Sequence, residues 1–138
     1  MNKIIASLII GFGFFFLSLN TQQVTAQSQD EIIQSIQEGS SSDLASYFNS
    51  SIALNINNNS GDFSKNQAEL IFRDFFRKFP PQSFEVIRQG EATEPLWYFI
   101  GNYRSEQDIF RVLIKGKSEN ETLGIYSIDF SKDQESFR

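Results

Sequence analysis

The chain has 138 residues, a formal net charge of −5, and neither cysteine nor histidine. These absences exclude disulfides, thiolate or histidine metal sites, and the Ser-His-Asp and Cys-His nucleophile arrangements, so we predict no metal site and no cofactor. The acidic balance repels phosphate backbones, and we expect no nucleic-acid partner.

The first residues have the layout of a secretory leader. Lys3 supplies a positive start, residues 4–19 form an apolar run, and Val24 and Ala26 place small residues at the −3 and −1 positions of a cleavage site. We therefore predict a signal peptide over residues 1–26 that export removes.

The alternative to a leader is a retained membrane anchor. A spanning helix needs about 20 apolar residues, and this run is shorter and is interrupted by Gly11 and Gly13. We favour cleavage, which leaves one domain over residues 27–138 with no stable membrane insertion.

Two helices are predicted at the start of this domain. Ser28, followed three residues later by Glu31, fits a capping box; an isoleucine stripe follows, and Gly39 is a natural stop. A second, short helix is predicted over residues 43–48. Its apolar face would carry Leu44, Tyr47 and Phe48.

A strand and a turn follow. Residues 51–57 alternate between apolar and polar side chains, which predicts a half-buried strand. Residues 57–62, with the sequence NNNSGD, have the composition of a turn.

The third predicted helix is rich in phenylalanine. Ser64 and Gln67 make a capping box at its start, and the pair Pro80 and Pro81 ends it. The phenylalanines could form the wall of a pocket for a small apolar ligand, with Phe72 and Phe76 as its candidates. We favour the simpler interpretation that they are core, since a domain without disulfides depends on such burial.

From residue 84 onward, apolar side chains recur at every second position. Four strands are predicted over 84–90, 96–103, 108–117 and 122–130, joined by short polar segments that favour an antiparallel meander. The sequence therefore predicts an α+β domain in which three helices pack on one face of a curved, mostly antiparallel sheet.

Residues that point to a known family are spread along the whole domain. They are Ser64-Lys65, Gln67-Ala68-Glu69, Phe75-Phe76, Pro80-Pro81, Phe84, Gly90, Tyr98, Ile100, Gly101, Tyr103 and Arg111-Val112. With the element order, they resemble a family of small exported bacterial proteins of unknown function in the nuclear transport factor 2-like, or cystatin-like, superfamily. The resemblance implies a cone-shaped fold and a periplasmic or extracellular location in a Gram-negative bacterium. It implies no catalytic residues.

The strand over 96–103 is apolar on both faces, so each face needs a cover. One cover is the helix layer, and the other could be a protein partner or a second copy, because the resembled superfamily often dimerises through its sheet. The alternative is an ordinary monomer surface with scattered apolar residues. The binding candidates are Trp97, Phe99, Tyr103 and Arg111.

Two further kinds of chemistry are open to the chain. Related folds isomerise steroids with an aspartate base and a tyrosine donor, for which Asp108 and Asp129 with Tyr98, Tyr103 and Tyr126 are the available residues. Basic residues could hold an anion, although acids four residues before Arg73 and Lys78 favour a solvated, ion-paired face. The basic residues are Arg73, Arg77, Lys78, Arg88 and Arg111.

We therefore expect an exported, non-catalytic domain that binds a protein partner or itself through its sheet. A small-molecule carrier or sensor with an interior cavity, and an isomerase-like enzyme built from Asp and Tyr, are the alternatives.

Overall fold

The computed structural model describes residues 21–90 and 95–134, which form three helices and six strands. Most of the predicted leader lies outside this range. Among the described residues no helix is both long and apolar enough to cross a membrane. The helices are α1 Thr21–Glu38, α2 Ser41–Ala45 and α3 Lys65–Lys78, and the strands are β1 Phe48–Ile56, β2 Asn59–Ser64, β3 Ser83–Gly90, β4 Leu96–Arg104, β5 Ile109–Glu119 and β6 Thr122–Lys132.

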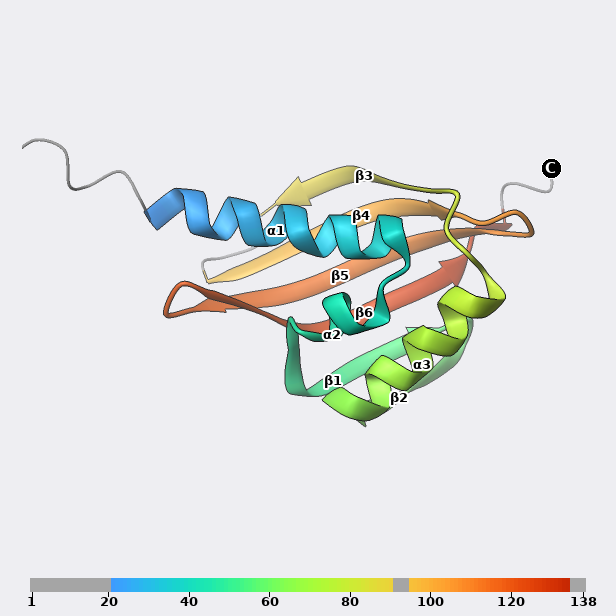
Figure 1. The fold of residues 1–138 in the computed structure, drawn as a ribbon, viewed down its shortest axis with the longest axis horizontal. Coiled ribbons are helices and arrows are strands. Elements are labelled where there is room, and N and C mark those ends of the chain that lie inside the picture. Colours follow the sequence, from blue (N-terminus) through green and yellow to red (C-terminus); the bar gives the residue numbers. More distant parts are fainter. Residues whose placement is uncertain (1–20, 91–94, 135–138) are drawn as a thin grey trace, which may run out of the picture.

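All six strands belong to one curved sheet, and the helices lie together on one of its faces (Figure 1). The strand order is β2-β1-β6-β5-β4-β3, and every pair is antiparallel except β1 with β6, which is parallel. The predicted α+β class and the meander of the last four strands are confirmed. The face that the helices cover is called the inner face below, and the opposite one the outer face.

The predicted turn over residues 57–62 is wrong, because most of that segment is β2. The turn itself is only Asn57 and Asn58, whose φ angles are 52° and 71°. Two central residues with positive φ define the tight hairpin turn whose twist matches that of the strands, and asparagine tolerates this conformation. The sheet therefore has six strands instead of five, and two of them precede α3.

The first two helices differ from their predicted bounds. Helix α1 begins at Thr21, so Ser28 lies inside it and the capping box predicted there is wrong; nothing in the preceding Gln- and Ala-containing segment breaks a helix. The predicted stop is confirmed, since Gly39 has a φ of 67°. Helix α2 is capped by Ser40 and ends at Ala45, and Phe48 is the first residue of β1.

Helix α3 matches its prediction at both ends. Ser64 Oγ accepts a hydrogen bond from the Gln67 N–H, and the Gln67 side chain accepts one from the Ser64 N–H, so the capping box is confirmed. The helix stops just before Pro80 and Pro81. Its predicted core residues are buried, and each contributes roughly 1.5–3 kcal/mol by leaving water. They are Phe72, Phe75, Phe76 and the capping residue Phe79.

Candidate functional site

Three binding candidates from β4 point away from the outer surface. The side chains of Trp97, Phe99 and Tyr103 are 3%, 0% and 0% exposed and lie in the core under the helices. Trp97 fits there because Gly116 has no side chain: a Cβ at Gly116 would lie 2.0 Å from the indole Cζ2. These residues are thus unavailable to a partner that covers the outer face.

The two candidates on α3 are also core residues. The Phe72 ring centroid lies 5.9 Å from that of Phe48 and 5.6 Å from that of Phe130, and the Phe76 centroid lies 6.2 Å from that of Tyr103. Such spacings are those of packed aromatic side chains. The three surface hollows described below are lined by other residues.

The structure separates the groups that an Asp–Tyr reaction centre would need. Asp108 lies in the loop between β4 and β5, 3.4 Å from the Lys132 ammonium, and lines a hollow there. Asp129 lies on β6 and accepts a hydrogen bond of 2.9 Å from Asn55 Nδ2. The Tyr103 hydroxyl is in the core, where burial raises its pKa. The half-buried side chains of Tyr98 and Tyr126 line neither of the hollows that contain these aspartates.

The basic residues of α3 have acidic neighbours on the same helix. Arg73 lies 3.5 Å from Glu69, which is the predicted pair, whereas Asp74 lies 3.6 Å from Arg77 rather than pairing with Lys78. On the strands, the Arg111 guanidinium is 4.0 Å from Asp133. These contacts describe a solvated, ion-paired surface of modest energetic weight.

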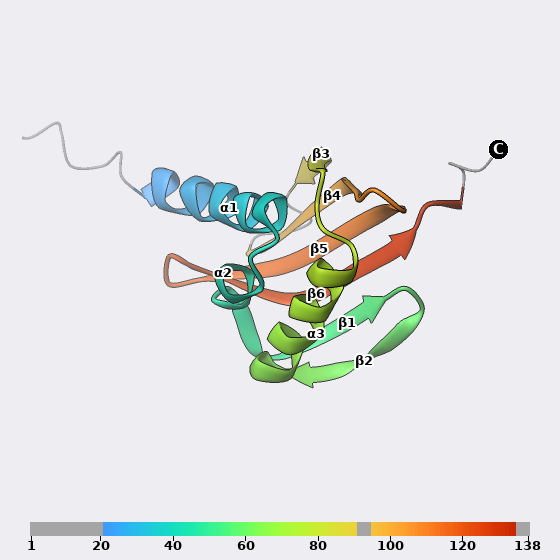
Figure 2. The same ribbon diagram turned by 45° about the vertical axis from the view of Figure 1, so that its right-hand side comes forward.

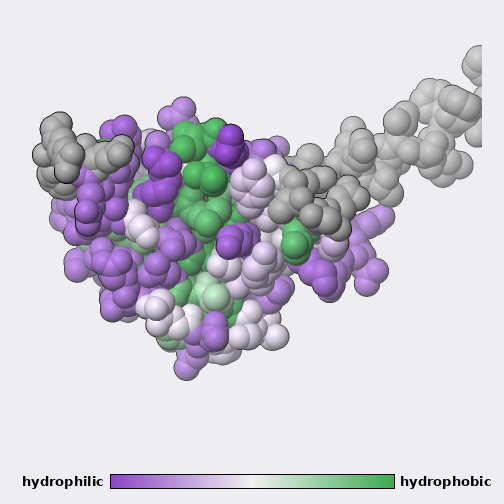
Figure 3. Space-filling model, turned by 180° about the vertical axis from the view of Figure 1, so that it is seen from behind, coloured by the Kyte–Doolittle hydropathy of each residue, from purple (hydrophilic) through white to green (hydrophobic). Residues whose placement is uncertain are grey.

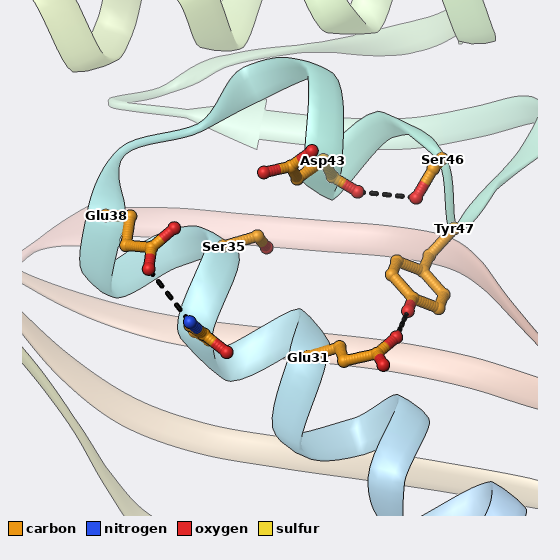
Figure 4. Close-up of a pocket in the computed structure, with 7 residues that line it drawn as sticks. Glu31, Ser35, Glu38, Asp43, Ser46 and Tyr47 are labelled. Atoms are coloured by element: carbon orange, nitrogen blue, oxygen red, sulfur yellow. Dashed lines mark hydrogen bonds between the residues drawn. The ribbon is translucent and has the colours of Figure 1, made fainter.

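A hollow of about 320 Å³ lies between α1 and the segment that leads from α2 into β1 (Figure 4). The Tyr47 hydroxyl donates a hydrogen bond to Glu31 of α1, and the Ser46 hydroxyl donates one to the Asp43 carbonyl. Burial, this hydrogen bond and the nearby carboxylates raise the pKa of Tyr47 to about 12. The hollow is lined by Glu31, Gln34, Ser35, Glu38, Asp43, Ser46 and Tyr47.

The Tyr47–Glu31 hydrogen bond in this hollow joins α1 to the segment that leads from α2 into β1. A phenol with a raised pKa keeps its proton at neutral pH and serves as a donor. No group of three or more acidic side chains in the described part of the chain is arranged to hold a metal ion. The Tyr47–Glu31 pair was not predicted, since the sequence around Tyr47 indicates the apolar face of a helix. A contact between two separate elements has no signal in the local sequence.

The outer face of the sheet carries apolar side chains at its centre. Ile100 of β4 and Leu113 of β5 lie directly opposite each other in the register, and both are half-buried, as are Leu96 and Tyr98. Figure 3 shows this face, with a band of apolar residues crossing it between polar flanks. Beside the band, Asn102 Oδ1 is buried and has no hydrogen-bond partner among the described residues.

Charges of both signs surround this apolar band. By register, Arg88 and Lys115 point outward from β3 and β5, and Glu85 and Asp129 point outward from β3 and β6. None of these four residues has an ion-pair partner among residues 21–90 and 95–134. Of the predicted binding residues, only Arg111 belongs to this outer face.

Comparison with known proteins gives a family and a fold. The family described as "Domain of unknown function (DUF4783)" matches residues 29–131. A DUF4783 family protein from Bacteroides uniformis is 27% identical, with a TM-score of 0.72 over 76% of this chain and 96% of that one. No curated protein matches.

More distant solved structures share the fold alone. A cystatin-like domain of unknown function from Nostoc punctiforme is 11% identical, with a TM-score of 0.63 over 85% of this chain and 82% of that one. An NTF2-like protein of unknown function from Shewanella baltica is 8% identical, with a TM-score of 0.62 over 84% and 98%. The predicted resemblance to a family of unknown function is confirmed, and the predicted fold is shared with these structures.

Proposed function

We propose that this chain, which belongs to the DUF4783 family of domains of unknown function, is an exported, non-catalytic binding domain that pairs with a second copy of itself through the outer face of its sheet. The observation that carries the proposal is the apolar band on that face, centred on Ile100 and Leu113. A sheet with one solvated face normally alternates apolar and polar residues, whereas β4 is apolar on both faces.

The charges around the band suit a second copy of the same surface. In a twofold interface each patch meets its own copy, so unpaired charges of both signs can find partners across the axis. Arg88 and Lys115 on one copy would then face Glu85 and Asp129 on the other. A cation-only or anion-only surface would instead favour a partner of opposite charge.

The interior fits this proposal better than it fits a carrier. Phe75 lies within 5.0–5.6 Å, between ring centroids, of Tyr103, Phe110 and Phe130, which leaves the space beneath α3 filled by side chains. In our proposal the helices and the curved sheet form a filled cone whose surface, not its interior, meets the partner.

Sedimentation of the protein recovered from cells that express the whole chain tests the association. We expect a concentration-dependent dimer at high micromolar protein. The substitution Ile100→Glu should shift it to monomer, because two desolvated carboxylates would meet near the axis. The matched control is Leu70→Glu, since Leu70 is 53% exposed on α3 and lies on the helix side of the sheet. A wild-type protein that stays monomeric would contradict the proposal, as would equal effects of the two substitutions.

Export is a separate part of the proposal and needs its own measurement. It is supported by the leader-like pattern of residues 1–26. The location we propose is the periplasm or the exterior of a Gram-negative bacterium. Mass spectrometry of the protein recovered from cells should give an N-terminus at or near Gln27, and an intact Met1 in the membrane fraction would contradict this.

A further inference from the structure

The two border strands of the sheet are protected to different degrees. Strand β3 has a register irregularity between Val86 and Arg88, and the Gln37 side chain of α1 donates a 3.2 Å hydrogen bond to the Phe84 carbonyl. Such bulges and covers keep a sheet edge from pairing with other chains. Strand β2, the opposite border, has a regular register with β1 and contains neither proline nor a basic residue. Figure 2 shows β2 at the border of the sheet, with no strand beyond it.

The register identifies the backbone groups that the β2 edge exposes. Ile56 and Asn59 flank the two-residue turn, so they form a hydrogen-bonded pair, and the alternation of an antiparallel ladder makes Gly61 and Phe63 bonded to β1 as well. The intervening residues Ser60 and Asp62 therefore direct their N–H and C=O groups away from β1. No hydrogen bond joins these groups to another described part of the chain.

A hollow of about 290 Å³ opens on the outer face immediately inside this edge. The Asp62 side chain is exposed, points to that face and has no ion-pair partner among the described residues. Asp129, which also lines the hollow, shares its carboxylate with Asn55 and Ser131. The outward main-chain groups of Ser60 and Asp62 thus lie next to the Asp62 carboxylate, which has no basic partner among the described residues.

We propose that the β2 edge binds an extended peptide segment that adds a strand to the sheet and places a Lys or Arg side chain against Asp62. Main-chain hydrogen bonds supply affinity in this mode of recognition, and alternate side chains supply specificity. A second copy of β2 is the less suitable occupant, because it brings another Asp62 and no basic residue to the border. The edge is separated from Ile100 and Leu113 by β1 and β6. Asp129 of β6 borders both surfaces, so each surface is tested with substitutions at residues that the other does not contain.

Amide hydrogen exchange followed by NMR tests the proposal residue by residue. The probe is the blocked peptide Ac-Thr-Val-Thr-Lys-Thr-Val-Thr-NH2, added to the protein recovered from cells that express the whole chain. Without peptide, we expect slow exchange at Gly61 and Phe63 and fast exchange at Ser60 and Asp62. With peptide at millimolar concentration, exchange at Ser60 and Asp62 should slow by at least about tenfold, because their N–H groups become hydrogen-bonded.

Two substitutions separate the backbone contribution from the charge. Ser60→Pro removes an outward N–H that β1 does not use, so binding should be lost while Gly61 and Phe63 stay protected, which shows that the hairpin remains folded. Asp62→Lys should weaken the binding of the lysine peptide and strengthen the binding of the same peptide with Glu in place of Lys. Asp74→Lys, an equal charge change on exposed α3, is the control.

Three results would overturn the inference. The first is unchanged exchange at Ser60 and Asp62 with every peptide, and the second is full binding by Ser60→Pro. The third is that exchanging Lys for Glu in the peptide changes its affinity for Asp62→Lys and for Asp74→Lys by the same factor.

Discussion

The hydroxyl of Tyr103, on the core face of β4 near the end of that strand, donates a hydrogen bond to the backbone carbonyl of Phe79. Phe79 is the residue that caps the C-terminal end of α3, where helix carbonyls lose their intrahelical partners. The buried Tyr103 side chain therefore supplies a hydrogen-bond donor to one carbonyl at the end of α3 and fixes the helix against the sheet.

Removing that hydroxyl should destabilise the protein. Tyr103→Phe keeps the ring and its aromatic contacts but leaves the buried Phe79 carbonyl without its donor, which costs about 1–3 kcal/mol. Urea denaturation measures the change in unfolding free energy. Tyr98→Phe, on the half-buried outer face, is the control and should have little effect; an unchanged midpoint for Tyr103→Phe would contradict the prediction.

The burial of Tyr47 and its hydrogen bond to Glu31 predict a loss of stability at high pH. The pKa of Tyr47 is about 12 in the folded protein and about 10 in an unfolded chain, so the folded state holds the proton more tightly. Its stabilising contribution is fully present below pH 10 and is lost as the pH rises towards 12. The unfolding free energy should fall in that window, and less steeply in Tyr47→Phe. Tyr103, whose pKa is also raised by burial, contributes to the slope that remains. Identical slopes for wild type and Tyr47→Phe would refute the raised pKa of Tyr47.

A side chain at Gly116 should disturb the packing of Trp97. The Cβ of Gly116→Ala would lie 2.0 Å from the indole Cζ2 and 2.6 Å from the Gly124 carbonyl, so the ring and the strand must both shift. Overpacking of this kind costs about 1–3 kcal/mol. The measurement is thermal unfolding with Trp97 fluorescence as the probe. In Gly61→Ala the added Cβ would meet only the ring of Phe63, at 3.2 Å, so this control should lower the stability clearly less.

The hairpin turn offers a stabilising change. Asn58 has a φ of 71°, which glycine adopts without steric cost, and Asn-Gly is the favoured pair for a turn of this type. Asn58→Gly should therefore raise stability by a few tenths of a kcal/mol, although glycine loses more entropy on folding. Thermal unfolding shows the sign. The same substitution at Asn55, inside β1, should lower the stability. A loss of stability at both positions would mean that the positive φ at Asn58 does not limit the stability of this hairpin.

Local chemistry explains which elements were predictable. Helix α3 has a capping box at Ser64 and two prolines after its end, and both signals depend on side chains next to the helix ends. Strand β2 has no such signal, since its sequence of Asn, Ser, Gly and Asp favours a turn in isolation. Its pairing with β1 is set by the two-residue turn before it.

The choice of sheet face shows what alternation alone cannot decide. Strand β4 presents Trp97, Phe99 and Tyr103 on one side and Leu96, Tyr98 and Ile100 on the other, and both sets are apolar. Packing of Tyr103 against Phe75 and Phe76 of α3, and of Trp97 against Gly116, places the first set in the interior.

The parallel pairing of β1 with β6 has a consequence for how the protein can be made. Leu54 lies opposite Ile128, so one central ladder of the sheet joins β1 to a strand that is synthesised after all the others. Contacts this distant in sequence form late and slow folding. The β1–β2 hairpin and the β3–β5 meander have no common neighbouring strand until residues 122–132 have been synthesised. Assembly of the sheet thus waits for the synthesis of β6, and a stop codon before residue 122 would leave two sheet fragments with no strand between them.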